Sequence, residues 1–478
     1  MKLRWRWGMV VVLGAAQPAS AAPAENWEAL TLHAAPKALP AGAITSHWPR
    51  FLGPHDRAES PETKLSHDLS GEGFKKIWEV RKGTGYACPA IAEGKLVLFH
   101  RVEDRETIEC LDPETGKRFW SFSYAVVYTD RYGYSNGPRA SPVIDGARVY
   151  TFGVTSVLTC LDLSAGKVVW QRDCAKEDGI PQYFFGTGAT PLVQGEVLVV
   201  DLGGKNGKDI GGFDKKSGAV KWFAKTGWEQ SYASPIPAVL RGKNRVFVFQ
   251  GGEGEEDTHS TGGLVCLDPL SGKVDDTFFW RAPRYTSVNA SSPVLCGENR
   301  LFISQAYIDS DAPSNGGVML EVSTDLKMKA LWKDEHIACH WMTPVFHDGH
   351  LYAFSGEKDR QCELVCYEAA TGTCKWRDKI EHEVKMADGR SLSVGLLRGS
   401  LLRVDDSFLA LGEWGTLCWL DLSPAGCVKK SCTQLFTAPY GAWTLPAISR
   451  GLLYVCQNEE DRITGQSRRL ICYDLRGL

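Results

Sequence analysis

The chain has 478 residues, a formal net charge of −3 and 23% charged residues. This near-neutral balance argues against a nucleic-acid or anionic-membrane binder, because such partners require a strongly basic surface. With 43% hydrophobic residues and 49 glycines, the composition is typical of a folded, turn-rich β protein.

Residues 1–21 have the three parts of a cleavable export signal. A basic start over residues 2–6 is followed by a short apolar run over 8–16 and a small-residue cleavage pattern at 19–21. The apolar run is too short to span a bilayer. The first cysteine is Cys88, so no lipid-modifiable cysteine follows the cleavage site. We therefore predict a soluble periplasmic or secreted protein without stable membrane insertion.

Residues 22–73 are predicted to form a leader and an N-terminal arm. Residues 22–39 are rich in alanine and proline and poorly patterned, which is typical of a mobile leader. The run Trp48-Pro49-Arg50-Phe51-Leu52-Gly53-Pro54 follows, then a polar stretch to Gly73. We expect this arm to lie on the folded body.

From residue 74 to residue 478 the chain repeats one pattern. Its clearest copy runs from Ala140-Ser141-Pro142-Val143 through Leu158-Thr159-Cys160-Leu161-Asp162 to Gly166-Lys167 and Trp170. The copies start near residues 88, 140, 189, 233, 291, 342, 401 and 445. Each is rich in β-branched and aromatic residues between glycine-bearing turns, which indicates four short strands. We predict an all-β fold: a single eight-bladed β-propeller of four-stranded blades.

The last copy predicts how the ring closes. It stops at residues 474–478, before the outer strand and the tryptophan of the other copies. Residues 74–80 read as an orphan outer strand that carries Trp78 in the expected place. We therefore predict that this N-terminal strand completes the last blade and leaves no unpaired edge.

The 15 cysteines are an odd number, and disulfides are possible in an exported chain. Five recur at one repeat position and are predicted to be small buried core residues rather than bridge partners: Cys110, Cys160, Cys266, Cys366 and Cys472. Cys427 and Cys432 are close enough to pair, as are cysteines among residues 362–374, and the spacing leaves the pairing open. The absence of a Cys-x-x-Cys motif excludes zinc ribbons, thioredoxin-type sites and covalent haem.

The connections between one blade's outer strand and the next blade's inner strand meet on one face, around the channel mouth. Here they are rich in aromatic and polar side chains, which predicts a binding site. The alternative is that these side chains pack against one another and fill the channel. The candidates are Arg131, Tyr134, Asn136, Arg139, Tyr183, Trp228, Tyr232, Tyr285, Asn289, His340, Trp341, Tyr440 and Trp443.

No catalytic residue or metal ligand is predicted. His340 has no serine, cysteine or carboxylate partner fixed by spacing, so a structural role is favoured. Acidic loops at residues 253–257 and 309–311 lack the glycine and terminal glutamate of a calcium loop. The sequence has no phosphate-binding glycine loop, metalloprotease histidine pair or nucleophile elbow.

The Gly137–Pro142 run, the Cys-Leu-Asp…Gly-Lys…Trp units and the arm motif at 48–54 together resemble the PQQ-like β-propeller repeat proteins. That superfamily includes quinoprotein alcohol and glucose dehydrogenases and a lipoprotein of the outer-membrane protein assembly machinery. The resemblance implies that the tryptophan closing each unit docks on the neighbouring blade. The matching positions are Trp78, Trp120, Trp170, Trp222, Trp280, Trp332 and Trp376.

Two functions stay open. The chain lacks the adjacent cysteine pair of the quinoprotein alcohol dehydrogenases, a recognisable calcium and catalytic aspartate set, and the lipid-anchored cysteine of the assembly lipoprotein. The first function is a monomeric, non-catalytic binding or scaffold protein with a protein, small-molecule or carbohydrate partner. The second is a divergent alcohol or sugar dehydrogenase that uses PQQ with calcium.

Overall fold

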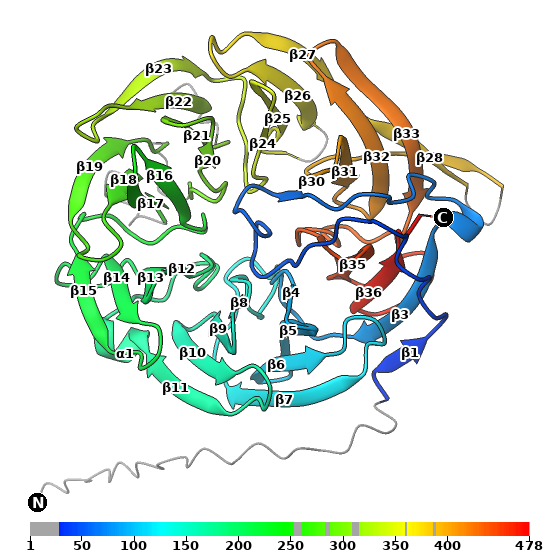
Figure 1. Cartoon of the computed structure of the whole chain (residues 1–478), viewed down its shortest axis with the longest axis horizontal. Coiled ribbons are helices and arrows are strands. Elements are labelled where there is room, and N and C mark those ends of the chain that lie inside the picture. The colour runs from blue at the N-terminus through cyan, green and yellow to red at the C-terminus, as the bar shows by residue number, and fades with distance from the viewer. Residues whose placement is uncertain are drawn as a thin grey trace, which may run out of the picture.

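The structure is a computed structural model that describes residues 28–252, 261–282, 287–307, 315–358, 361–385 and 389–477. Eight antiparallel sheets stand around a central axis as the blades of a propeller (Figure 1). The predicted fold class is therefore confirmed. The predicted export signal lies outside the described residues.

The first four blades follow one another in chain order. Blade 1 contains β4 (Ala90–Ala92), β5 (Lys95–Val102), β6 (Arg105–Leu111) and β7 (Arg118–Ala125). Blade 2 contains β8 (Val143–Asp145), β9 (Arg148–Phe152), β10 (Val157–Asp162) and β11 (Val168–Asp173). Blade 3 contains β12 (Leu192–Gln194), β13 (Val197–Asp201), β14 (Ile210–Asp214) and β15 (Val220–Ala224). Blade 4 contains β16 (Ile236–Leu240), β17 (Lys243–Gln250), β18 (Gly263–Leu267) and β19 (Val274–Phe279).

Three further blades repeat this order, and the eighth is built from both ends of the chain. Blade 5 contains β20 (Val294–Leu295), β21 (Arg300–Ser304), β22 (Gly317–Val322) and β23 (Met328–Asp334). Blade 6 contains β24 (Val345–His347), β25 (His350–Ser355), β26 (Glu363–Glu368) and β27 (Cys374–Asp378). Blade 7 contains β30 (Ser400–Val404), β31 (Ser407–Leu411), β32 (Thr416–Ser423) and β33 (Gly426–Gln434). Blade 8 contains β34 (Ala447–Ser449), β35 (Leu452–Gln457) and β36 (Arg469–Asp474).

The N-terminal strand β3 (Lys75–Arg81) closes the ring, as predicted. It pairs antiparallel with β36, with Lys75 opposite Asp474 and Arg81 opposite Arg469. A further strand, β1 (Leu30–Leu32), pairs with the outer side of β3. Blue and red ribbons therefore lie side by side in Figure 1. This pairing satisfies the backbone at what would otherwise be the open edge of blade 8.

Tryptophans on the outer strands join neighbouring blades. In blade 1, the Trp120 indole Nε1 donates to the Leu163 carbonyl of blade 2 at 2.8 Å. A Cβ on Gly166, at φ +67°, would lie 2.5 Å from the Trp120 ring, so the docking site requires glycine. The same indole-to-carbonyl bond joins Trp78 to Pro113, Trp170 to Lys215, Trp222 to Pro269, Trp332 to Ala369 and Trp376 to Ser423.

Trp280 does not occupy the equivalent position. In blade 4 the residue opposite Cys266 is Asp276, where the other blades place their tryptophan. The Asp276 carboxylate accepts from the Met328 backbone N–H of blade 5 at 2.7 Å. Trp280 follows the end of β19, and its indole donates to the Gly316 carbonyl at 3.2 Å. Blade 4 therefore joins blade 5 through a carboxylate and a displaced indole.

In blade 7 the tryptophan lies on β32, the strand next to the outer strand β33. Trp419 of β32 lies opposite Ser431 of β33, and the Trp419 side chain is fully buried. The His67 ring of the N-terminal arm stacks on Trp419 with centroids 4.4 Å apart. The Ser431 hydroxyl donates to the His67 carbonyl. An arm residue thus covers the blade that has no docking tryptophan on its outer strand.

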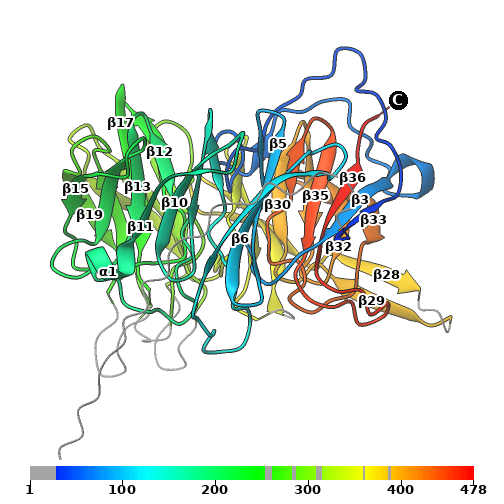
Figure 2. The same ribbon diagram turned by 90° about the horizontal axis from the view of Figure 1, so that it is seen from below.

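The arm lies on the face of the ring opposite the channel mouth. The arm contacts the blades near the turns that join the first strand of a blade to its second strand. The mouth connections enter each blade at the opposite end of its first strand. Trp48 is fully buried and bridges to Ile91 of blade 1, and the Pro49 carbonyl accepts from Ile144 of blade 2. Strand β2 (Glu59–Ser60) pairs in parallel with β30. Figure 2 shows the arm along one face of the ring.

The five recurring cysteines are buried, as predicted. The disulfide joins Cys418 to Cys432 across β32 and β33. Cys427 is therefore not the partner of Cys432, and the local pair that its spacing allowed does not form.

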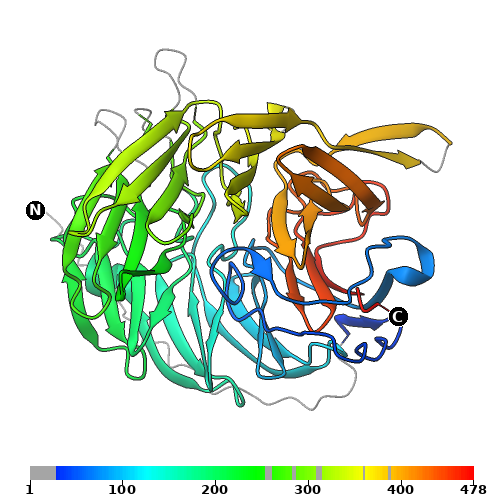
Figure 3. The ribbon, with the colours of Figure 1, turned by 45° about the horizontal axis from the view of Figure 1, so that its top comes forward.

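A hairpin of β28 (Glu381–Lys385) and β29 (Ser391–Gly395) stands beside the blades (Figure 3). The ring also carries the α-helix α1 (Cys174–Asp178) and the 3-10 turn η1 (Gly71–Gly73). None of the described helices has the length and apolarity that crossing a membrane requires.

Candidate binding site at the channel mouth

Nine aromatic side chains from six mouth connections form one continuous group, which we call the mouth cluster. Tyr134 is its centre: its ring centroid lies 5.3 Å from Trp443, 5.8 Å from Tyr440 and 6.1 Å from Phe185. The Tyr440 and Trp443 rings are 4.9 Å apart. The full cluster is Tyr86, Tyr132, Tyr134, Phe184, Phe185, Tyr232, Trp341, Tyr440 and Trp443.

The cluster packs on itself and also presents a surface. Tyr132 is 49% exposed, Tyr440 is 40% exposed and Tyr134 is 39% exposed. The other members are half-buried or buried. An aromatic layer therefore covers the mouth, and three tyrosines of that layer face solvent.

A buried ion pair holds the loop that carries Tyr132 and Tyr134. Arg139 lies 2.5 Å from Asp130, which is 4% exposed. The second Asp130 oxygen accepts from the backbone N–H groups of Tyr132 at 2.9 Å and Tyr134 at 3.2 Å. The Asn136 side chain accepts from the Asp130 N–H at 2.7 Å. These hydrogen bonds from backbone N–H groups to the Asp130 carboxylate fix the conformation of the loop in the unbound protein.

A second buried ion pair holds Trp443. The Arg398 guanidinium donates to both oxygens of Glu413, at 2.6 and 3.1 Å, and Glu413 is fully buried. The Trp443 indole N–H donates to the same carboxylate at 2.8 Å. The Arg398 guanidinium also lies 5.2 Å from the Trp443 ring centroid. Sequence reasoning missed Arg398 and Glu413, because both lie in the weakest repeat.

Other predicted residues contribute to the same layer. The exposed Arg131 guanidinium lies 4.5 Å from the Phe184 ring, and the Arg139 guanidinium lies 5.4 Å from the Phe185 ring. The Tyr232 hydroxyl accepts from the Phe185 N–H at 3.1 Å. Phe184 and Phe185 themselves were not among the predicted candidates, although they stand in a predicted mouth connection.

Several predicted residues lie apart from the cluster. Tyr183 is buried and its hydroxyl donates to the Gly203 carbonyl at 3.1 Å. Asn289 is buried and its amide donates to the Gln250 carbonyl at 2.8 Å. His340 Nε2 lies 3.1 Å from the Tyr307 hydroxyl, and desolvation lowers the pKa of His340 to about 3. The histidine is therefore neutral at ordinary pH. Tyr285 lies outside the described residues.

Trp228 lines a separate, open cavity of about 480 Å³ between the β13–β14 loop of blade 3 and the connection from blade 3 to blade 4. Its lining consists of Gly203, Gly204, Asn206, Gly207, Asp209, Lys225, Gly227, Trp228 and Glu229.

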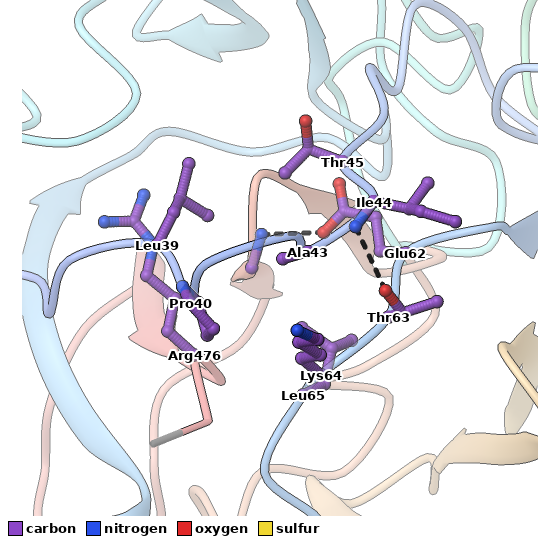
Figure 4. A pocket seen from close by; sticks show the side chains of 11 residues that line it. Leu39, Pro40, Ala43, Ile44, Thr45, Glu62, Thr63, Lys64, Leu65 and Arg476 are labelled. Carbon is purple, nitrogen blue, oxygen red and sulfur yellow. Dashed lines mark hydrogen bonds between the residues drawn. The ribbon is translucent and has the colours of Figure 1, made fainter.

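A narrow crevice also lies between the arm and blade 8 (Figure 4). The Glu62 carboxylate there accepts from the backbone N–H groups of Arg450 and Gly451, each at 2.6 Å. The Thr63 hydroxyl accepts from the Ile44 N–H at 3.0 Å. Its polar groups are thus engaged in attaching the arm.

Comparisons with known proteins agree with this architecture. Residues 104–312 match the family described as outer membrane protein assembly factor BamB. No curated protein sequence matches the chain. This match covers less than half of the chain and supports the repeat resemblance over those residues, while the rest of the ring shares the eight-bladed fold.

Three solved structures illustrate the shared fold. A europium-containing methanol dehydrogenase superposes with a TM-score of 0.62 at 10% identity, covering 90% of this chain and 98% of that one. The quinohemoprotein alcohol dehydrogenase from Comamonas testosteroni gives 0.61 at 12% identity, covering 92% and 82%. BamB from Moraxella catarrhalis gives 0.53 at 13% identity, covering 84% and 97%. At such identities the likeness shows the fold alone.

Two arginines of the mouth are already engaged and are not free to hold the PQQ of the quinoprotein resemblance. PQQ carries carboxylates that need free cations, but Arg139 and Arg398 are each already paired with a buried carboxylate. Calcium needs six or more oxygen ligands. Within the described ranges, no group of three or more histidine, cysteine, aspartate or glutamate side chains could hold a metal ion.

Proposed function

We propose that this eight-bladed β-propeller is an exported, non-catalytic binding protein of PQQ-like repeats whose mouth cluster docks a protein partner. The observation that carries this proposal is the exposed group of Tyr132, Tyr134 and Tyr440 above two buried ion pairs. Tyrosine, tryptophan and arginine supply most of the binding energy at protein interfaces. A surface fixed in advance loses less entropy on binding.

The titratable groups beside the cluster are engaged in holding it. Asp130 and Glu413 are each bonded to an arginine, and His340 is neutral because its pKa is about 3. A general base needs a pKa near the working pH and access to the substrate proton. The arrangement therefore favours contact with a partner over proton transfer.

Two observations support export. The first is the predicted signal at residues 1–21. The second is the disulfide between Cys418 and Cys432, because disulfides persist mainly in oxidising compartments. The matched family, described as an outer membrane protein assembly factor, is also consistent with a role beyond the cytoplasm.

Site-specific photocrosslinking in the native host tests the docking surface. A benzophenone amino acid is placed at Tyr134 and, as a matched control, at Phe119, an equally exposed aromatic on β7 (43% against 39%). We expect a discrete crosslinked protein from position 134 that disappears when Tyr132 and Tyr440 are both replaced by alanine. Identical crosslinks from both positions would contradict the proposal.

Reconstitution tests the enzymatic alternative. PQQ and calcium are added to the purified protein, and the quinone absorbance and dye-linked oxidation of alcohols and sugars are followed. We expect no bound quinone, because Arg139 and Arg398 of the mouth are already paired with buried carboxylates. Bound quinone with turnover of an alcohol or sugar would overturn the binding-protein proposal.

A further inference from the structure

We propose that the cavity between blades 3 and 4 binds a carboxylated sugar ring, independently of any partner at the mouth cluster. Its volume of about 480 Å³ is in the range of small-molecule sites. Its walls are the hairpin loop between β13 and β14 and the connection between β15 and β16. The first wall supplies Asn206, and the second supplies Lys225, Trp228 and Glu229.

Asp209 fixes the two walls relative to one another. It is 5% exposed, and its carboxylate accepts from the backbone N–H groups of Thr226 at 2.7 Å and Gly227 at 2.6 Å. Its own backbone lies in the hairpin loop, where its carbonyl accepts from Leu202 and Gly203. The carboxylate of Asp209 is therefore part of the wall, and the cavity exists before a ligand binds.

Two glycines let the hairpin loop pack closely on the connection that forms the other wall. Gly203 has φ +56°, and a Cβ there would lie 2.2 Å from the Gln230 nitrogen. The side of Gly207 is covered by the Lys225 stem, whose Cδ would be 3.3 Å from an added Cβ. The bare backbone of Gly207 thus lets the Lys225 stem lie against the loop, and Lys225 lines the cavity.

Three side chains give the cavity its chemical character. Trp228 is half-buried, packs on the apolar core between blades 3 and 4 and lines the cavity, so it offers a flat apolar wall. Within the described part of the chain, no carboxylate pairs with the Lys225 ammonium. Glu229 accepts from the Thr261 hydroxyl through Oε2 at 3.0 Å, which leaves its other oxygen for a further donor.

A sugar carrying a carboxylate complements all three groups. The C–H face of its ring covers the indole, its hydroxyls donate to Glu229, and its carboxylate pairs with Lys225. A neutral sugar leaves the lysine without a partner. A phosphate-rich ligand is disfavoured by Glu229, and the neighbouring Lys208 is already bonded to Asp178 at 3.1 Å.

Calorimetric titration with D-glucuronate tests this site. We expect measurable binding to the full chain, weakened about tenfold by Lys225→Gln and by Trp228→Ala, because each removes one contact. Lys221→Gln is the matched control: this lysine lies four residues before Lys225, on β15, pairs with Asp214 at 3.6 Å and does not line the cavity. Glucose and cyclohexanecarboxylate, which each lack one feature of the ligand, are expected to bind about tenfold more weakly.

Two further measurements make the outcome decisive. Trp228→Phe retains an apolar ring on the core and replaces Trp228→Ala if the alanine variant does not fold. Trigalacturonate distinguishes the source: tighter binding than the monosaccharide indicates a polymeric acidic glycan, and equal binding indicates a free sugar acid. Absence of binding by glucuronate, or binding that Lys225→Gln leaves unchanged, would overturn the proposal. Neither result depends on the mouth cluster.

Discussion

Replacing Glu106 by glutamine is expected to stabilise the protein at alkaline pH. Glu106 lies on β6 and is fully buried, with no cation among its hydrogen-bond partners. Its carboxyl group accepts from the Tyr124 hydroxyl at 2.6 Å and from the Val154 N–H at 2.8 Å. Burial nevertheless raises the pKa of Glu106 from 4.5 to about 7, because desolvation outweighs both bonds.

The size and sign of the effect follow from this pKa. The Glu106 carboxyl group holds its proton more tightly in the folded state than in the unfolded state. Protonated Glu106 therefore contributes fully to the free energy of unfolding below about pH 4.5, and this contribution is lost as the pH rises through about 7. The difference corresponds to about 3 kcal/mol of unfolding free energy at pH 8. Glutamine carries no charge at any pH and retains a donor and an acceptor. Glu106→Gln is therefore expected to match the native protein near pH 4.5 and exceed its stability at pH 8.

Thermal and urea unfolding at pH 4.5, 6 and 8 measure this difference. Glu109→Gln is the matched control, because Glu109 lies on the same strand and is equally buried but contacts Arg118 at 3.0 Å and His100 at 3.4 Å. Hydrogen bonds and charge from His100 and Arg118 lower the pKa of Glu109 despite its burial. Its replacement is expected to destabilise the protein at neutral pH. A Glu106→Gln variant that is less stable than the native protein at pH 8 would refute the reasoning.

Three other perturbations test the fold and the site. Deleting residues 75–81 removes the strand that closes blade 8 and is expected to abolish the cooperative calorimetric transition; an unchanged melting temperature would contradict ring closure. Arg398→Met leaves Glu413 buried without its cation and is expected to cost about 3–5 kcal/mol in urea unfolding, much of it recovered by adding Glu413→Gln. Cys418→Ser opens the disulfide and is expected to cost about 3 kcal/mol under oxidising conditions, with no difference from the native protein in excess reductant.

The ring and its closure could be predicted because they depend on residues that recur. In five blades a turn glycine lies beneath the indole of the preceding blade, and the spacing from the acidic residue to the tryptophan indicates that register. Trp78 has this role without an upstream strand partner, so its isolation near the N-terminus pointed to blade 8. Local sequence was sufficient to predict the ring because the same indole-to-carbonyl contact recurs between most successive blades.

Trp280 shows where this reasoning needed the strand register. It follows Asp268 by twelve residues, against eight residues from Asp162 to Trp170 in the clearest copy. That longer spacing was the available signal that Trp280 lies beyond the docking position, which Asp276 occupies. The disulfide shows the same limit: Cys418 and Cys432 are fourteen residues apart but directly opposite across β32 and β33. Separation along the chain does not reveal cross-strand pairing.

The mouth was predictable in composition and not in detail. Connections of this kind follow no period, so the sequence indicates which side chains meet there but not which of them pair. Tyr134, Tyr440 and Trp443 were found by residue type. Arg398 and Glu413 were missed because each lies beside a strand of blade 7, where the repeat is weakest.

The irregularity of blade 7 links the two faces of the ring. Its outer strand lacks a docking tryptophan, and the arm compensates by placing His67 on Trp419. At the opposite face, the same blade supplies Glu413, which holds Trp443 of the mouth cluster. The departure from the repeat thus both anchors the arm and positions an aromatic of the proposed docking surface, which places the specific features of this propeller where its sequence is least regular.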